Sequence, residues 1–131
     1  MKRIASTIAA LVLCLLALSS HAETWVELEG PAFTLPPNAL KDIKSRLQPA
    51  VSAGARQRIP PWRDYLIQYR PRYLTGTRVV EIHGSCKFDP GDDIHREFVD
   101  QHIKDGGICY FIVFYMPDSG EFSNVVFHGN A

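Results

Sequence analysis

Apolar side chains recur at intervals of three and four residues in one stretch of the chain. The spacing predicts an amphipathic helix with a buried stripe of Leu40, Ile43 and Leu47. Asn38 is a favourable N-cap because it follows two prolines. Pro49 should end or kink this helix, since its ring clashes with the preceding turn. The Ala-rich residues 50–58 have room for one or two further helical turns.

From Trp62 onward the apolar period changes from 3.6 to 2, which is typical of strands. The pattern predicts four strands, near residues 65–70, 78–86, 108–116 and 122–129. Pro71 limits the first of these to an edge or a bulge. The third strand is apolar on both faces and suits a central position. The Pro-Asp-Ser-Gly sequence at residues 117–120 predicts the turn that joins it to the fourth.

Two regions are less regular. Residues 23–37 contain three prolines and are predicted to be an extended lead-in, with a short edge strand near 24–29. The polar excursion at 87–106 fits either a short helix capped by Asp92 or Asp93 or an extended segment. The predicted fold is α+β, with one N-terminal helix packed on a four-stranded antiparallel meander sheet.

The first 22 residues have the order of a cleavable secretory signal peptide. Lys2 and Arg3 form a positive n-region, an uncharged apolar run covers 8–18, and small residues precede a cut after Ala22. The run is shorter than the roughly 20 apolar residues that a membrane anchor needs. We therefore expect one mature domain of residues 23–131, periplasmic or secreted, with no membrane association after cleavage.

Cysteine usage agrees with export. Cys14 leaves with the signal peptide, so Cys86 and Cys109 remain. An even number of cysteines in an oxidising compartment pairs by default, and the bond would add about 3.5 kcal/mol of loop-closure entropy. A redox-active thiol pair is the alternative, although such pairs usually lie two residues apart at a helix start.

Charge is distributed unevenly along a nearly neutral chain. After cleavage 12 basic residues face 14 acidic ones, and nine of the basic residues fall within 41–78. Arginine and tyrosine are common interface anchors. We therefore predict a surface for a protein partner carried by Arg63, Tyr65, Tyr69, Arg70, Arg72 and Tyr73. The alternative is that Trp62, Tyr65 and Tyr69 are core residues beneath the helix. Export argues against a nucleic-acid partner.

Polar side chains gather between residues 83 and 105. A metal site there is disfavoured, because His95 and His102 would lie about 10 Å apart along a helix. We interpret this region as a solvated acidic connection and expect neither a metal nor a cofactor. Ser85 lies in no nucleophile-elbow sequence, so we predict no catalytic residue. The candidate lining of a ligand pocket is Glu81, His83 and His128.

The stretch Asp-Gly-Gly-Ile-Cys-Tyr-Phe at 105–111, together with residues 122–131, resembles small uncharacterised exported proteins of proteobacteria. One helix, four strands and a disulfide between strands resemble the cystatin-like fold. That fold includes protease inhibitors, binding modules and enzymes, so the resemblance does not choose a function. The Gln-x-Val-x-Gly loop of cystatins is absent, so the resemblance does not extend to inhibition of cysteine proteases.

Two functions of different class follow from these features. The first is an exported binding module, with inhibition of a protein partner as one form of it. The second is a small periplasmic enzyme with a pocket between helix and sheet, lined by Glu81, His83 and His128. An exposed aromatic patch would favour the first, and a concave pocket with converging histidine and carboxylate groups would favour the second.

Overall fold

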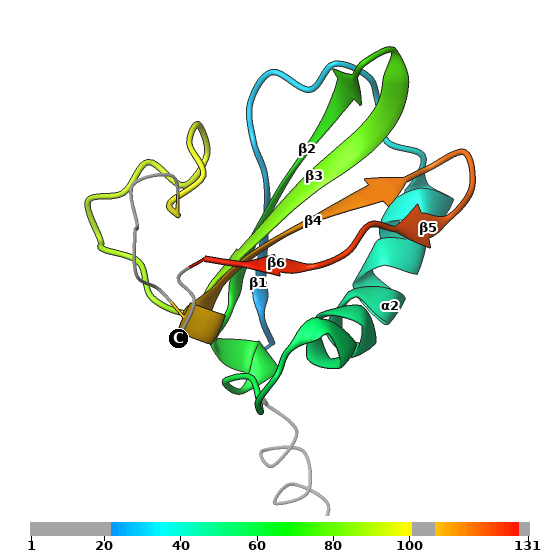
Figure 1. Cartoon of the computed structure of the whole chain (residues 1–131). Coiled ribbons are helices and arrows are strands. Elements are labelled where there is room, and N and C mark those ends of the chain that lie inside the picture. The colour runs from blue at the N-terminus through cyan, green and yellow to red at the C-terminus, as the bar shows by residue number, and fades with distance from the viewer. Residues whose placement is uncertain (1–21, 101–106, 129–131) are drawn as a thin grey trace, which may run out of the picture.

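The structure, a computed structural model, describes residues 22–100 and 107–128 (Figure 1). The predicted signal peptide up to residue 21, residues 101–106 with His102, and residues 129–131 lie outside this range. The described residues form one α-helix and a mixed sheet, so the α+β class is confirmed. The elements in order are β1 (Thr24–Glu27), α2 (Pro37–Gly54), η1 (Trp62–Asp64), β2 (Leu66–Leu74), β3 (Thr77–Ser85), η2 (Gly107–Cys109), β4 (Tyr110–Met116), β5 (Glu121–Phe122) and β6 (Val126–Phe127).

The sheet has the strand order β1-β2-β3-β4, with β5 and β6 both paired to β4. The predicted antiparallel pairing of β2, β3 and β4 is confirmed. However, β1 pairs in parallel with β2, because the chain crosses through α2 between these strands and returns in the same direction. The sheet is therefore mixed and six-stranded, instead of the four-stranded antiparallel meander that the sequence predicted.

Two prolines lie inside regular elements without ending them. α2 continues through Pro49 to Gly54, where the missing N–H would have bonded to the carbonyl of Ser45. Both Pro49 and Ser45 are on the exposed side of the helix, so water can satisfy that carbonyl. Pro71 lies within β2 but past the end of β1, whose last residue pairs with Tyr69. β2 is therefore an edge strand at Pro71, and the proline removes no ladder hydrogen bond.

The predicted last strand is divided into two short pieces. Ser123 lies between these two pieces, and its side chain takes the place of a backbone acceptor of the sheet. The Phe114 N–H donates to Ser123 Oγ at 2.9 Å. Its own N–H donates to the Phe114 carbonyl at 2.8 Å. Val125 packs toward Gly54 at the end of α2. The chain thus leaves the sheet briefly to cover the C-terminal end of the helix.

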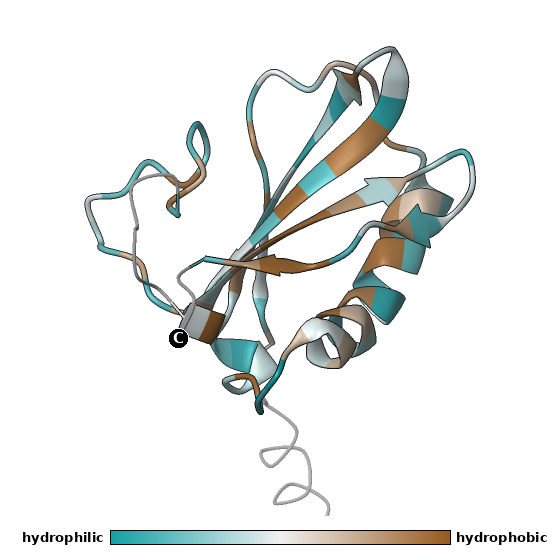
Figure 2. Ribbon diagram, viewed as in Figure 1, coloured by the Kyte–Doolittle hydropathy of each residue, from teal (hydrophilic) through white to brown (hydrophobic). Residues whose placement is uncertain are grey.

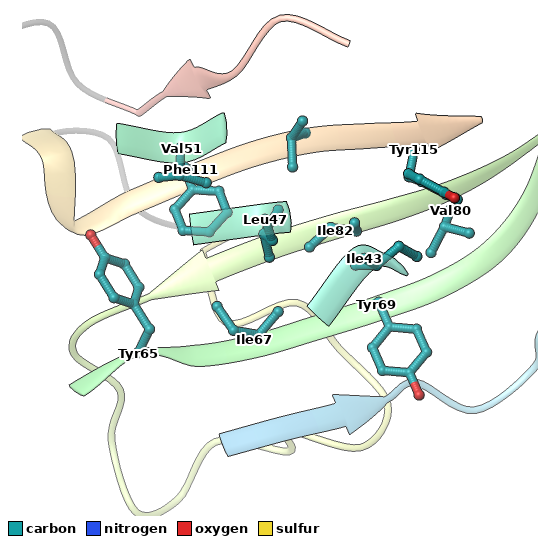
Figure 3. Close-up of a cluster of buried hydrophobic side chains, with 11 residues drawn as sticks. Ile43, Leu47, Val51, Tyr65, Ile67, Tyr69, Val80, Ile82, Phe111 and Tyr115 are labelled. Carbon is teal, nitrogen blue, oxygen red and sulfur yellow. The ribbon is translucent and has the colours of Figure 1, made fainter. Parts of the chain in front are cut away.

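The sheet face that α2 covers holds the hydrophobic core (Figure 3). Ile43 and Leu47 have no exposed surface and Leu40 is partly buried, which confirms the predicted helix stripe. The helix side chains pack against alternate residues of three strands, chiefly Ile67, Tyr69, Val80, Ile82, Phe111, Val113 and Tyr115. Strand alternation places the intervening residues on the opposite face.

Segment 86–100 covers that opposite face and consists of turns rather than a helix. The residues of this segment are mostly hydrophilic (Figure 2). Its backbone lies on the other side of the sheet from α2 (Figure 1). Gln68 in β2, fully buried, binds it at three points. The Gln68 amide donates to the carbonyls of Ile94 at 2.9 Å and Glu97 at 2.6 Å, and it accepts from the Val99 N–H at 3.0 Å.

Cys86 and Cys109 form the predicted disulfide, which connects the end of β3 to the start of β4. Their Cα atoms are 5.1 Å apart. The Cys86 N–H also donates to the Cys109 carbonyl at 3.0 Å. The bond thus fixes both ends of the connection that contains segment 86–100.

Candidate functional site

The three predicted pocket residues lie near one another, but on the sheet face opposite α2. Glu81 and His83 alternate along β3 with Val80 and Ile82, which face the helix. His128 follows β6, and its N–H donates to the Tyr110 carbonyl at 3.0 Å. The predicted pocket between helix and sheet is therefore not lined by these residues, because apolar side chains fill that space.

A line of five alternating basic and acidic side chains crosses this face; we call it the charged chain. Arg72 Nη1 donates to Glu81 Oε1 at 2.9 Å, and Glu81 Oε2 lies 3.8 Å from His83 Nε2. His83 Nδ1 is 2.6 Å from Asp100 Oδ1. Asp100 Oδ2 is 3.3 Å from His128 Nε2. The sequence placed Asp100 in the solvated connection, but it bridges two histidines.

The centre of the charged chain is almost completely shielded from water. His83 is 5% exposed and Asp100 is 1% exposed. Burial opposes the protonated form of His83, but the Asp100 and Glu81 carboxylates outweigh it and raise the pKa of His83 above its ordinary value. Burial likewise opposes the charged form of Glu81, yet His83 and Arg72 lower its pKa. The geometry therefore favours a buried imidazolium between two carboxylates.

Aromatic stacking holds this ion cluster beneath segment 86–100. The His83 and Phe98 rings are nearly parallel, with centroids 3.6 Å apart. The Arg70 guanidinium lies 5.3 Å from the Phe98 centroid. Phe98 is 1% exposed and is the main apolar anchor of the segment. Stacking and ion pairing therefore act on the same point of contact.

The chemistry open to the charged chain is limited by access. Among the described residues, His83 Nε2, Asp100 Oδ2, His128 Nε2 and the Ser85 hydroxyl are buried without a well-aligned hydrogen bond. A general acid or base must reach its substrate, and the His83 side chain is too enclosed for that. In the part of the chain that the structure describes, no group of three potential ligands is arranged to hold a metal ion.

The six predicted partner-binding residues do not form one surface. Tyr65 and Tyr69 are buried beneath α2, so they are core residues, as the alternative interpretation of the sequence predicted. Arg70 and Arg72 contribute to the face under segment 86–100. Arg63 lies in η1, at the other end of β2 from Tyr73. Tyr73 is the one aromatic residue of the six that is exposed.

Tyr73 lies at the end of the β2–β3 hairpin, which extends beyond β4 (Figure 1). We define the hairpin tip as Tyr73, Leu74, the turn residues Thr75 and Gly76, and Phe33. Tyr73 is 53% and Leu74 is 41% exposed. Thr75 and Gly76 both have positive φ, and a two-residue turn of that kind matches the twist of the strands.

Contacts from Phe33 and Arg78 support the Tyr73 side chain within the hairpin tip. The Phe33 ring meets Tyr73 edge to face at 5.7 Å, and the Arg78 guanidinium lies 5.5 Å from the Phe33 centroid. Arg78 is in turn paired with Asp118 in the β4–β5 turn. The exposed Tyr73 ring is thus backed by a second ring and an ion pair.

A cavity of about 690 Å³ lies elsewhere, at the C-terminal end of α2. Its lining includes Gln48, Ser52, Arg58, Ile59, Trp62 and Ile108. None of the five charged-chain residues lines it. This cavity and the buried titratable groups of the charged chain are therefore in different places.

No family model, curated protein or solved structure matches this chain. Within the described residues, the structure contains no helix with the length and apolar character needed to cross a membrane. The function therefore has to be argued from the sites themselves.

Proposed function

We propose that this protein is an exported binding module that contacts a protein partner through the hairpin tip. The observation that carries the proposal is the exposure of two adjacent large side chains, Tyr73 and Leu74, on a projecting hairpin. Tyrosine supplies a large contact area at a low cost in conformational entropy. Most exposed apolar residues occur singly on protein surfaces, so a supported cluster of Tyr73, Leu74 and Phe33 favours an interface.

The proposal includes export through the signal peptide and a periplasmic or secreted location. The disulfide and the absence of a membrane-spanning helix among the described residues are compatible with it. The resemblance to the cystatin-like fold supports this proposal, because that fold includes protease inhibitors and binding modules. Inhibition of the partner is one form that such binding takes, because a projecting hairpin can enter a cleft.

The enzyme alternative has less support from the geometry. It required histidine and carboxylate groups that converge in an open pocket, whereas His83 and Asp100 are enclosed. The open cavity is lined by amides, one hydroxyl, one guanidinium and apolar groups instead. The His128 side chain is 29% exposed, but its Nε2, which faces Asp100, is buried.

Site-specific photo-crosslinking in cells that export the full chain would test the proposal. A photoreactive phenylalanine replaces Tyr73 or Leu74 in turn, and Lys41, exposed on α2, provides the control position. We expect one discrete adduct from both tip positions and none from Lys41. With the partner identified and purified, Tyr73→Ala should weaken binding about tenfold or more, and Lys41→Ala should leave it unchanged. Adducts that are absent, or equal at all three positions, would refute the tip as the interface.

A further inference from the structure

The cavity at the end of α2 has rigid walls on three sides. One wall is the last part of the helix, with Gln48 and Ser52. The second is the segment 57–62, stiffened by two adjacent prolines, whose rings fix the backbone. The third is Ile108, next to the disulfide-bonded Cys109. A pocket with walls fixed in this way needs little ordering when a ligand binds.

Trp62 and Ile108 are themselves held in place by the core. The Trp62 ring stacks on Phe111 with centroids 6.1 Å apart and an angle of 16° between the planes. The Tyr65 hydroxyl donates to the Ile108 carbonyl at 2.9 Å. The apolar floor of the cavity is thus an extension of the domain core. Its volume lies within the usual range for small-molecule sites, about 300–1,000 Å³.

The polar side chains around this floor include one positive charge and several hydrogen-bond donors. Among the described residues, the lining contains Arg58, two glutamines and a serine, and no carboxylate. Arg58, Arg56 and Arg63 make no ion pair with any residue that the structure describes. The C-terminal end of α2 contributes about half a negative charge, which the full charge of Arg58 exceeds. Amide and guanidinium donors beside an apolar floor complement an anion that carries a ring or an alkyl body.

We propose that this cavity binds a small organic anion, with its apolar body against Trp62 and Ile108 and its acidic group at Arg58. The site is separate from the hairpin tip and goes beyond the proposed partner-binding function. Its failure and that of the tip interface are distinguishable, because Tyr73 and Leu74 do not line the cavity.

The test uses two fluorescent probes that share an anilinonaphthalene body. Anilinonaphthalene sulfonate is an anion, whereas N-phenylnaphthylamine is neutral. Each is titrated into the oxidised mature protein at low ionic strength. We expect the sulfonate to bind more tightly than the neutral probe. Arg58→Gln should weaken sulfonate binding about three- to tenfold, as expected for a partly screened charge-assisted contact, and should change binding of the neutral probe less than about twofold.

Two further variants locate the site. Arg63→Gln makes the same change of charge at an exposed residue outside the cavity lining and should leave both affinities unchanged. Ser52→Phe fills the cavity from an exposed helix position and should weaken both probes. Thermal unfolding confirms that each variant is folded. Equal loss in the two arginine variants would overturn the assignment to Arg58. Probe binding that survives Ser52→Phe would overturn the cavity as the site.

Discussion

Replacement of Gly84 by alanine gives a direct test of the packing between β3 and β4. Gly84 pairs with Ile67 on one side and Phe111 on the other, and the Phe111 ring lies over its backbone. A Cβ at position 84 would lie 2.0, 2.2 and 2.7 Å from three atoms of that ring. Carbon atoms in favourable contact are about 3.5–4.0 Å apart, so the ring would have to move by more than about 1 Å.

The Phe111 ring has little freedom to make that movement. It has no exposed surface and contacts Trp62, Tyr65 and Phe127. Overpacking a well-filled core costs about 1–3 kcal/mol and occasionally more, and this case belongs at the upper end because three ring neighbours must shift. We expect a loss of about 3 kcal/mol, which lowers the Tm of a domain of this size by about 12–24 °C.

Urea unfolding followed by tryptophan fluorescence would measure this loss. Gly91→Ala is the matched control, since nothing lies within 4 Å of a Cβ there, and it should change stability by less than about 0.5 kcal/mol. Without the clash, glycine to alanine within a strand should stabilise by about 0.5–1 kcal/mol. A loss of stability in Gly84→Ala would therefore indicate the clash, and a gain would indicate its absence. In a Phe111→Ala background, where the ring that causes the clash is absent, Gly84→Ala should therefore stabilise by about 0.5–1 kcal/mol. A Gly84→Ala protein as stable as the parent would refute the packing described here.

Three further predictions concern the disulfide, the charged chain and the helix-to-sheet hydrogen bond. Replacing Cys86 and Cys109 together by alanine should lower the free energy of unfolding by about 3.5 kcal/mol, measured in urea; an unchanged midpoint would contradict this value. Because the pKa of His83 is raised above 6.5 in the folded state, its ion pairs stabilise fully below that pH and are lost as pH rises through the folded pKa. The Tm advantage of the parent over His83→Gln should therefore be larger at pH 5.5 than at pH 9, and an advantage that grows with pH would reverse the assigned protonation. The Tyr115 hydroxyl, 2.7 Å from Asp42 Oδ2, is the largest cause of the lowered pKa of Asp42, so Tyr115→Phe should raise that pKa in an NMR titration; an unchanged value would assign the lowering to other groups.

Elements with a long apolar pattern were predictable from sequence. The period of 3.6 located α2, and the period of 2 located β2, β3 and β4 within a few residues. β1 was foreseen as a short edge strand, but its direction was not. The four residues of β1 do not indicate whether the strand runs parallel or antiparallel to β2. Its direction depends on how α2 packs across the sheet.

The charged chain was only partly predictable. Glu81 and His83 share a face because they are two residues apart on a strand, and that relation was visible in the sequence. His83 and Asp100 are 17 residues apart in the sequence, and the chain between the end of β3 and Asp100 is irregular, so no periodicity predicts their contact. One signal did exist: Phe98 is a large apolar residue in a polar stretch. The burial of Gln68 is seen only in the structure.

The two faces of the sheet explain where binding sites are available. α2 packs on the sheet mainly through apolar side chains, because its interior backbone groups are satisfied within the helix. Segment 86–100 is irregular, so the sheet beneath it must offer polar partners. Gln68 binds the backbone of the segment, and His83 pairs with its Asp100. Both faces are thus committed to holding the fold together. The hairpin tip and the cavity lie at opposite ends of β2, beyond these two layers, and the residues with room for a partner are found there.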